Sequence, residues 1–519
     1  MSTLLSSVLQ SPSGDVAFPA IIIAGILATI GILAFYGADA DQPYPGIPVV
    51  GKGEKVKSTT QAKQVWLKSA KNLIYDTLKA TGRPFQVLAS TGPLIILPAH
   101  HMDEIRNDDR MTFGRFLKSA FFTSYPGFQG FRPAVDNEVF TSSVRIGLTQ
   151  AIGQITGILS REMGDTLADV WPLQDEWKTT YFNPDSLKII ARLSSRTFLP
   201  DPLCHDPDWL RISVEYTLDF FAAAYALRLV PVPLRPIAHW FLPQTRKARK
   251  DVEIATRKIQ PEVDSRRAKA KAAREAGKEY DAPADALTWM ARAAEKHGIS
   301  NYNLAWGQLN YSLGAIHTTA ITFMNCVYDL TARPEYIDLL REEIDATGWK
   351  EGDEMNKTIL YKLKLMDSFM KESQRLSPVT LIPINRIAHE DVTLSDGTKI
   401  PKGAILGVPI TAMTDGKYQE DPLTFNGHRF YDKRQQDGNE SKFQFVTTSN
   451  DFIAFGHGKH ACPGRFFASN EIKIALVHML TKYDMRFPPG KGRPESIPIG
   501  VSMAPNPKGE MQYRKRQHR

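Results

Sequence analysis

Cysteine is scarce in this 519-residue sequence, which contains only Cys204, Cys326 and Cys462. An odd number of widely spaced cysteines argues against a disulfide framework and favours a reducing compartment. The chain has no internal repeat, and its formal charge of +8 is modest for its length. With 42% hydrophobic and 23% charged residues, the composition excludes a disordered chain and is typical of a globular protein.

Basic residues are absent from the first 51 positions, and residues 17–36 carry no charge at all. About 20 apolar residues is the length that spans a bilayer as a helix. A cleaved signal peptide would have a shorter apolar core with basic residues before it. Three lysines follow between 52 and 57, which favours a cytoplasmic location for the downstream part. We therefore expect a lumenal segment over 1–16 and a transmembrane anchor over 17–36.

Strand-like sequence is also limited. Alternating or β-rich stretches occur at 85–90, 92–98 and 391–401, the last around an Asp-Gly turn. Hydrophobic positions elsewhere recur with helical spacing, most clearly over 144–163 and 302–332. The sequence therefore predicts a mainly α fold with small β-sheets.

The chain between the anchor and its body is rich in proline. Residues 37–52 hold three prolines that favour extended backbone, so we interpret them as a linker to a single domain over 53–519. Within this domain the stretches 246–250 and 265–285 are strongly basic. We expect them to form a solvated helix end and a surface loop. Nucleic-acid binding is not expected, because no aromatic platform is interleaved with the charge.

One segment near the C-terminus concentrates unusual residues: FGHGKHACPGRFFA, over 455–468. The part GHGKHA fits a dinucleotide-binding fingerprint, with Asp484 about twenty residues later. Too little chain follows Asp484 to form another strand–helix–strand unit, which argues against this interpretation. A structural zinc site could use His457, His460 and Cys462, but no second ligand pair lies nearby.

A third interpretation is a single thiolate, Cys462, bound to haem iron. Glycines at 456 and 458 would let the loop turn tightly and direct its amides at the sulfur. Pro463 and Gly464 would open a helix whose positive N-terminal end favours a negative sulfur. Phe455 could shield the sulfur from water. This interpretation explains each residue type in the segment.

The segment resembles the haem-binding loop of cytochrome P450 enzymes, with the pattern F-x-x-G-x-x-x-C-x-G. Phe455, Gly458, Cys462 and Gly464 occupy its fixed positions. The resemblance extends over residues 40–519 and implies the cytochrome P450 fold with an N-terminal transmembrane helix. It implies haem b as cofactor and Cys462 as the axial ligand of the iron.

Other motifs of that family occur in the expected order. Glu372 and Arg375 in KESQRL resemble its E-x-x-R pair, and Arg429 resembles the arginine that completes this cluster. A buried carboxylate shared by two guanidinium groups would be satisfied by bidentate hydrogen bonds. The resemblance also implies that Arg386 and Arg145 bind the haem propionates, although the tryptophan that normally precedes Arg145 by four residues is Thr141 here. His460, two residues before the cysteine, could reach a propionate as well.

The oxygen-activation helix departs from the family pattern [A/G]-G-x-[D/E]-T-[T/S]. This chain has GAIHTT over 314–319, so His317 replaces the usual acid while Thr318 is retained. The resemblance implies a role for Thr318 in binding dioxygen and water. A histidine can transfer protons near neutral pH, so we expect His317 and Thr318 to form the proton relay.

The resemblance implies a monooxygenase that oxidises an apolar small molecule. It is similar to fungal enzymes of terpenoid, indole-diterpene and steroid oxidation, the ent-kaurene oxidase-like group. Segments 121–128, 219–227 and 380–384 resemble family segments that line the substrate pocket. No flavin or nicotinamide motif is present, so NADPH–cytochrome P450 reductase is the expected partner, at the endoplasmic reticulum membrane with the catalytic domain cytoplasmic. A haem-thiolate isomerase or dehydratase, and a non-enzymatic haem-binding receptor, are the alternatives.

Overall fold

The computed structural model describes residue 25 and the ranges 42–53 and 56–517. Within those residues no helix is both long enough and apolar enough to cross a membrane. The predicted lumenal segment 1–16 and anchor 17–36 lie outside the described part, apart from Gly25. The described part of the linker is not helical. It pairs with the first strand, where the amide of Val50 donates to the carbonyl of Gln86 at 2.8 Å.

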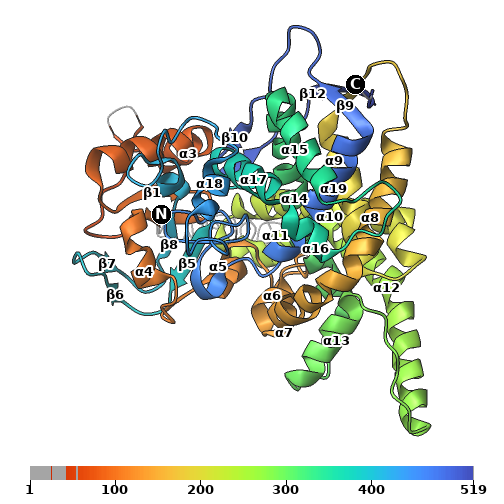
Figure 1. Ribbon diagram of the computed structural model, residues 1–519. Coiled ribbons are helices and arrows are strands. Elements are labelled where there is room, and N and C mark those ends of the chain that lie inside the picture. Colours follow the sequence, from red (N-terminus) through yellow and green to blue (C-terminus); the bar gives the residue numbers. More distant parts are fainter. Residues whose placement is uncertain (1–24, 26–41, 54–55, 518–519) are drawn as a thin grey trace, which may run out of the picture.

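Helices make up most of the structure, as the sequence predicts (Figure 1). The longest are α3 (Thr59–Thr81), α8 (Thr149–Val170), α9 (Phe182–Phe198), α10 (Pro207–Arg228), α12 (Pro243–Glu275), α14 (Leu304–Thr331) and α19 (Arg465–Lys482). The shorter ones are α4 (Met102–Ile105), α5 (Phe113–Ala120), α6 (Arg132–Asp136), α7 (Val139–Ser142), α11 (Arg235–Phe241), α13 (Ala286–Lys296), α15 (Pro334–Ala346), α16 (Lys357–Lys362), α17 (Lys364–Leu376) and α18 (Arg429–Gln435). A π-helical segment, η2 (Ser143–Leu148), precedes α8.

The strands form small sheets. The largest has the order β1 (Phe85–Ala89), β2 (Gly92–Ile96), β8 (Ile405–Val408), β5 (Ile384–Ala388) and β3 (Met111–Thr112). A three-stranded sheet has the order β4 (Lys178–Tyr181), β12 (Glu510–Lys515) and β9 (Tyr483–Arg486). Two hairpins complete the set, β10 (Ile497–Ile499) with β11 (Ser502–Ala504) and β6 (Val392–Thr393) with β7 (Lys399–Ile400). All pairs are antiparallel except β2 with β8.

The predicted strands are confirmed at β1, β2 and the β6–β7 hairpin, whose turn places Gly397 at φ +85°. The two helices predicted from periodicity are also present. One runs through η2 into α8 and ends at Val170, and the other is α14. Asn303 caps α14, because its side chain accepts a hydrogen bond from the amide of Trp306 at 3.0 Å.

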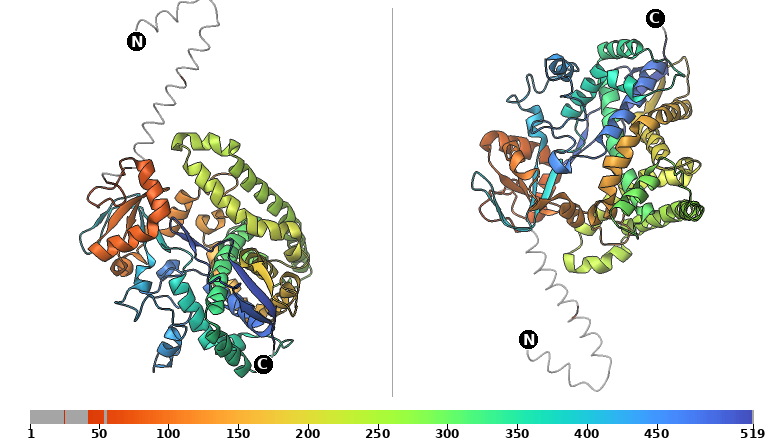
Figure 2. Two further views of the ribbon diagram at one scale, coloured as in Figure 1. Left: turned by 90° about the horizontal axis from the view of Figure 1, so that it is seen from above. Right: turned by 60° about the horizontal axis from the view of Figure 1, so that its bottom comes forward.

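Helix α14 lies at the centre of the helical region, and most of its residues are buried. It contacts α9, α10, α12, α17 and α19, which together hold the larger hydrophobic core. A second core lies under the five-stranded sheet and α3, on the left in Figure 1. The other views in Figure 2 show the same division between the sheet-containing part and the helices. The cysteine segment precedes α19, which is itself packed on α14.

Candidate active site

The cysteine loop is held in a tight turn before α19. The Cys462 amide donates to the carbonyl of Phe455 at 2.7 Å, which closes the loop. Gly456 and Gly458 have φ values of +70° and +74°, a region that favours glycine. A Cβ atom at Gly458 would lie 2.7 Å from Asn107 Oδ1. Gly458 is therefore required both for its φ angle and for its close approach to the chain at Asn107.

Cys462 is half-buried, and the amides that reach its sulfur differ from those predicted. Backbone amides of Gly464 and Arg465, at the start of α19, donate to it. The amide of Gly456 instead donates to the carbonyl of Ile453 at 2.8 Å, so Gly456 helps the loop to turn, as predicted, but does not direct its own amide at the sulfur. The first amides of a helix have no partner within the helix and are free to bind an anion. Burial raises the pKa of the Cys462 thiol, while these amides and the Arg465 guanidinium act in the opposite direction.

A cavity of about 390 Å³ lies over Cys462. One wall is α14, on which Gly314 and Thr318 are exposed although most of the helix is buried. The Thr318 hydroxyl donates to the Gly314 carbonyl at 2.8 Å. The rest of the lining is mainly apolar and includes Phe113, Phe140, Val144, Leu148, Phe198, Val379, Pro383, Phe455, Phe467 and Ile472. An apolar chamber with one thiol on its wall suits a flat, hydrophobic cofactor.

Basic groups lie near one side of this cavity. Arg386, on β5, is 1% exposed, and its Nε and Nη2 have no partner among the described residues. His460 lines the cavity, and its Nε2 is likewise buried and unpartnered. Burial lowers the pKa of Arg386 to about 10, and burial together with the charge of Arg386 lowers that of His460 to about 4. Arg145, on η2, is exposed and donates through Nη2 to the Lys459 carbonyl.

The donor set fits a haem. Buried, unsatisfied polar groups are costly, so Arg386 and His460 are suited to carboxylate oxygens such as those of haem propionates. The thiol and the apolar walls suit the iron and the porphyrin face. Sequence reasoning missed Arg465, which also donates through Nη1 to the Cys462 carbonyl at 2.8 Å. Arg465 lies three residues after the cysteine, in the first turn of the predicted helix, and this spacing could have indicated that it lies close to Cys462.

Glu372, Arg375 and Arg429 form the predicted cluster. Arg375 donates through Nε and Nη2 to the two carboxylate oxygens of Glu372, both at 2.8 Å. Arg429 adds contacts from Nε to the same oxygens at 3.1 and 3.2 Å. Glu372 and Arg375 are fully buried and Arg429 is 8% exposed. Arg375 also donates to the Met413 carbonyl at 2.9 Å, so the cluster ties α17 to the chain that leads into the cysteine loop.

His317 does not line the cavity. Its Nε2 donates to the carbonyl of Val214, on α10, at 2.8 Å. Burial lowers the pKa of this imidazole. The proton relay predicted for His317 and Thr318 stays a prediction, and in this structure only Thr318 faces the cavity.

Of the three segments expected to line the pocket, one lines the cavity over Cys462 and two do not. Segment 380–384 contributes Thr380 and Pro383 to the cavity. Segments 121–128 and 219–227 are not part of this lining and pack against each other. The ring centroids of Phe121 and Phe220 are 5.8 Å apart, and those of Phe128 and Phe220 are 5.4 Å apart. Sequence alone could not show that these aromatic side chains have one another as partners.

Neither alternative interpretation of the cysteine loop agrees with the structure. The strand after α19 is β9, which belongs to an antiparallel sheet, whereas a dinucleotide site requires parallel strands. Asp484 on β9 pairs with Arg341 at 3.1 Å. For zinc, His457 is occupied by Arg106 at Nε2 and Thr448 at Nδ1. Among the described residues, one group of side chains is close enough together to bind a metal ion: Asp201, Cys204 and His205. Hydrogen bonds already link these three side chains.

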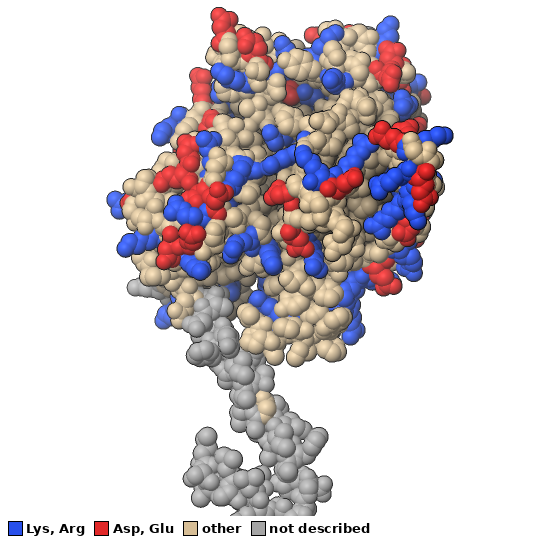
Figure 3. Space-filling view, turned by 90° about the horizontal axis from the view of Figure 1, so that it is seen from below, with Lys and Arg blue, Asp and Glu red and all other residues tan. Residues whose placement is uncertain are grey.

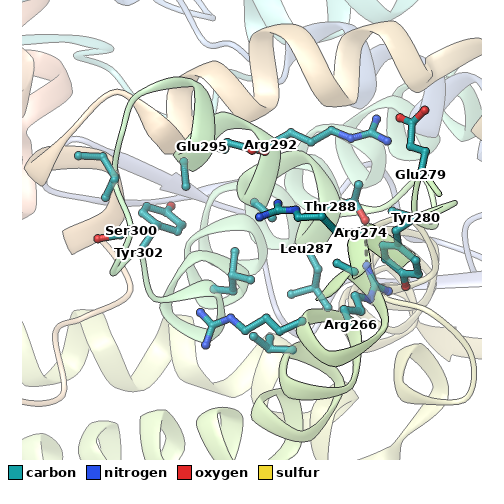
Figure 4. Close-up of a pocket in the computed structure, with 18 of the residues that line it drawn as sticks. Arg266, Arg274, Glu279, Tyr280, Leu287, Thr288, Arg292, Glu295, Ser300 and Tyr302 are labelled. Carbon is teal, nitrogen blue, oxygen red and sulfur yellow. Dashed lines mark hydrogen bonds between the residues drawn. The ribbon is translucent and has the colours of Figure 1, made fainter. Parts of the chain in front are cut away.

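A larger recess of about 1000 Å³ lies between α12, α13 and the loop that joins them (Figure 4). The second basic stretch borders it and is a helix end followed by a loop, mostly exposed as expected, with Arg266 as an exception. Arg266 is buried and binds Asp285 through Nη1 and Nη2 at 2.7 and 2.6 Å. The first basic stretch, 246–250, lies within α12 near its start. No residue of the cysteine loop lines this recess, so its size does not make it the active site.

Glu471, on α19, gives a prediction about pH-dependent stability. It is fully buried, accepts a hydrogen bond from the Ser194 hydroxyl at 2.8 Å, and burial raises its pKa to about 8. The unfolded chain has a pKa of about 4.3 at this position, so unfolding near neutral pH releases a proton. This contribution to stability is complete below the unfolded pKa and is lost as the pH rises to about 8.

We expect the free energy of unfolding of the wild type to fall relative to Glu471→Gln between about pH 5 and pH 8, by up to about 1.4 kcal/mol per pH unit. Urea unfolding at several pH values measures this difference. A constant difference between the two proteins across this range would show that Glu471 is ionised in the folded state.

Comparison with known proteins agrees with the site. The family model for cytochrome P450 matches residues 215–512. Cytochrome P450 monooxygenase hepE of Aspergillus oryzae is 40% identical over 452 residues, covering 86% of this chain and 81% of the relative. Cytochrome P450 monooxygenase adrA of Penicillium rubens is 38% identical over 504 residues, covering 96% and 97%. A third relative, cytochrome P450 monooxygenase 1 of Gibberella fujikuroi, is 38% identical and covers 84% and 98%. The chain therefore belongs to the cytochrome P450 family and is a monooxygenase of the oxidoreductase class.

Proposed function

We propose that this monooxygenase oxidises a large, rigid, apolar molecule of the terpenoid, indole-diterpene or steroid class, with haem b as its cofactor. The observation that carries the proposal is the cavity over Cys462, whose lining is mainly apolar and includes Thr318. The sequence resemblance to fungal terpenoid and steroid oxidases supports the substrate class. A haem bound here would supply oxygen activation, with Cys462 as its thiolate ligand.

Residues of the chain would stabilise the thiolate, bind the propionates, hydrogen-bond to ligands and exclude water. The amides of Gly464 and Arg465 stabilise negative charge on Cys462. Arg386, His460 and Arg145 would hold the propionates. The hydroxyl of Thr318 faces the cavity and can exchange its hydrogen bond to the Gly314 carbonyl for one to a ligand or a water. The apolar walls would exclude bulk water and orient the substrate by shape.

Electrons must reach the site from another protein, and we infer that NADPH–cytochrome P450 reductase is the donor. Lys459 lies in the cysteine loop, where it is about one-third exposed and pairs with Asp109, and Arg145 lies beside the loop and is exposed. Basic side chains at this position suit an acidic partner surface.

We test the proposal by mixing purified protein with reductase, NADPH and a panel of isoprenoids and steroids. Substrate-dependent consumption of NADPH and oxygen, with an oxygenated product, supports the function. Product formed without NADPH would indicate the isomerase or dehydratase chemistry instead. Ligand binding without any product would indicate a receptor.

We also propose a single-pass anchor in the endoplasmic reticulum membrane, with the catalytic domain cytoplasmic. An exposed apolar patch supports a membrane-facing surface. Its four large side chains are more than half exposed and lie at the end of α10 and on α11: Leu229, Ile237, Trp240 and Phe241. Figure 3 shows an uncharged area, bordered by basic side chains, at the lower edge of the face seen from below. Such patches on monomers commonly contact membranes or proteins.

Replacing these four side chains by serine in a chain that starts at residue 42 is expected to weaken its binding to phosphatidylcholine–phosphatidylserine vesicles by at least about tenfold. The reason is that burying one large apolar side chain contributes about 1.5–3 kcal/mol. Cosedimentation measures the change. The control replaces three large apolar side chains elsewhere that are also more than half exposed, Leu173, Tyr361 and Leu423. An equal loss in both variants would mean that this patch does not face the membrane.

A further inference from the structure

His317 and Thr318 are neighbours on α14 but have different surroundings. Successive residues of an α-helix project about 100° apart, so two neighbours need not share a face. Thr318 lines the cavity over Cys462, while His317 is absent from that lining and reaches α10. The residue that replaces the usual acid thus makes its polar contact away from the chamber.

The contact is a hydrogen bond of 2.8 Å between His317 Nε2 and the Val214 carbonyl. A carbonyl oxygen can only accept, so Nε2 must carry the proton. The same oxygen is the helical acceptor for the amide of Leu218, and its second lone pair can receive the imidazole. The contact therefore joins the two helices without breaking the backbone pattern of α10.

Few other polar contacts hold these helices together. Helix α10 packs on α14, and most of its buried side chains are apolar, among them Ile212, Ala223 and Ala224. Among the described residues, no other hydrogen bond connects α10 to α14. Apolar packing allows small sliding movements that a directional hydrogen bond resists. A single donor at His317 can thus set the register of α10 on the turn that carries Gly314 and Thr318.

We propose that His317 is a positioning residue, which joins α10 to α14 through the Val214 carbonyl and holds Thr318 in place over Cys462. In the arrangement described here it does not pass protons to Thr318. The importance of placing Thr318 rests on the proposed function. The hydrogen bond between His317 and the Val214 carbonyl does not depend on it. Burial lowers the pKa of the imidazole, in agreement with a neutral ring whose Nε2 is a fixed N–H donor.

Two substitutions separate the hydrogen bond from the volume of the side chain. His317→Gln keeps an N–H donor, and His317→Phe keeps a ring of similar size without a donor. Glu215→Gln is the matched control, since it removes a surface ion pair with Arg211 one residue from Val214. Hydrogen–deuterium exchange of α10 amides in the full-length haem protein is the measurement.

We expect exchange in α10 to be about fivefold faster in His317→Phe, because a net hydrogen bond worth about 1 kcal/mol corresponds to that factor. His317→Gln and Glu215→Gln should exchange like the wild type. Wild-type exchange in His317→Phe would overturn the proposal, and so would equally fast exchange in His317→Gln and His317→Phe.

The reduced, CO-bound spectrum of each protein distinguishes failure of this inference from failure of the proposed function. A wild type without a thiolate-type spectrum contradicts the proposed function, whatever the exchange result. A normal spectrum in all variants with unchanged α10 exchange contradicts only the role of His317. If His317→Phe does not fold, wild-type exchange and a normal spectrum in His317→Gln still support the donor role, whereas fast exchange in that variant overturns it.

Discussion

Replacing Cys462 by serine is expected to abolish the absorption band at about 450 nm that reduced, CO-bound haem-thiolate proteins show. The physical reason is that the amides of Gly464 and Arg465 are arranged around the atom at position 462, and a serine hydroxyl remains protonated there. Oxidation of substrate should fall to background in the same variant. Absorption difference spectroscopy of purified wild type and variant measures the band, and haem content is measured in parallel.

Replacement of a distant buried cysteine is the control. Cys326→Ala changes a fully buried thiol on α14 whose pKa burial raises to about 12, so it is not suited to ligate iron. This variant should keep the band. A band at about 420 nm in freshly folded wild type would contradict thiolate ligation by Cys462.

Removing the carboxylate of Glu372 is expected to cause the largest loss of stability outside the cysteine loop. Glu372→Ala would leave the guanidinium groups of Arg375 and Arg429 buried without their counter-charge. Removing one partner of a buried ion pair costs about 3–5 kcal/mol, which is a large share of the stability of a typical domain. We expect little folded haem protein, and the yield of the 450 nm band together with Tm measures the effect.

A surface pair provides the contrast. Asp136 pairs with Arg132 at 2.7 Å, with both side chains more than 40% exposed. Asp136→Ala should change the free energy of unfolding by less than about 1 kcal/mol, because exposed ion pairs contribute little. A similar yield for Glu372→Ala and Asp136→Ala would mean that the buried cluster is not needed for folding.

Several residues of the site were predictable from the sequence because their roles depend on short spacings. Gly458 and Cys462 lie four residues apart in one tight loop, and Glu372 and Arg375 lie one turn apart on α17. Backbone geometry brings such pairs together whatever the rest of the chain does. The strands at β1 and β2 were likewise predictable, since alternation and a short turn determine a hairpin locally.

Other features depend on partners that are far away in the sequence. Most of the basic stretch 265–285 is exposed, as expected, but Arg266 within it is buried and binds Asp285, the N-cap of α13. The aromatic residues of 121–128 looked like pocket lining, but Phe220 packs against them from α10. Sequence patterns indicate which element a residue belongs to, but they do not show which surface packs against it. Both corrections therefore needed the tertiary structure.

The sequence by itself indicated the family, through its motifs, named Cys462 as the candidate iron ligand, and predicted the mainly helical architecture from hydrophobic periodicity. Tertiary structure decided which groups face which. It assigned the amides near the sulfur to the start of α19 and directed His317 to α10. It also left Nε and Nη2 of Arg386 and Nε2 of His460 without a partner among the described residues. The direction of a side chain and the burial of a charge depend on contacts between distant segments, and these form only when the helices pack around α14.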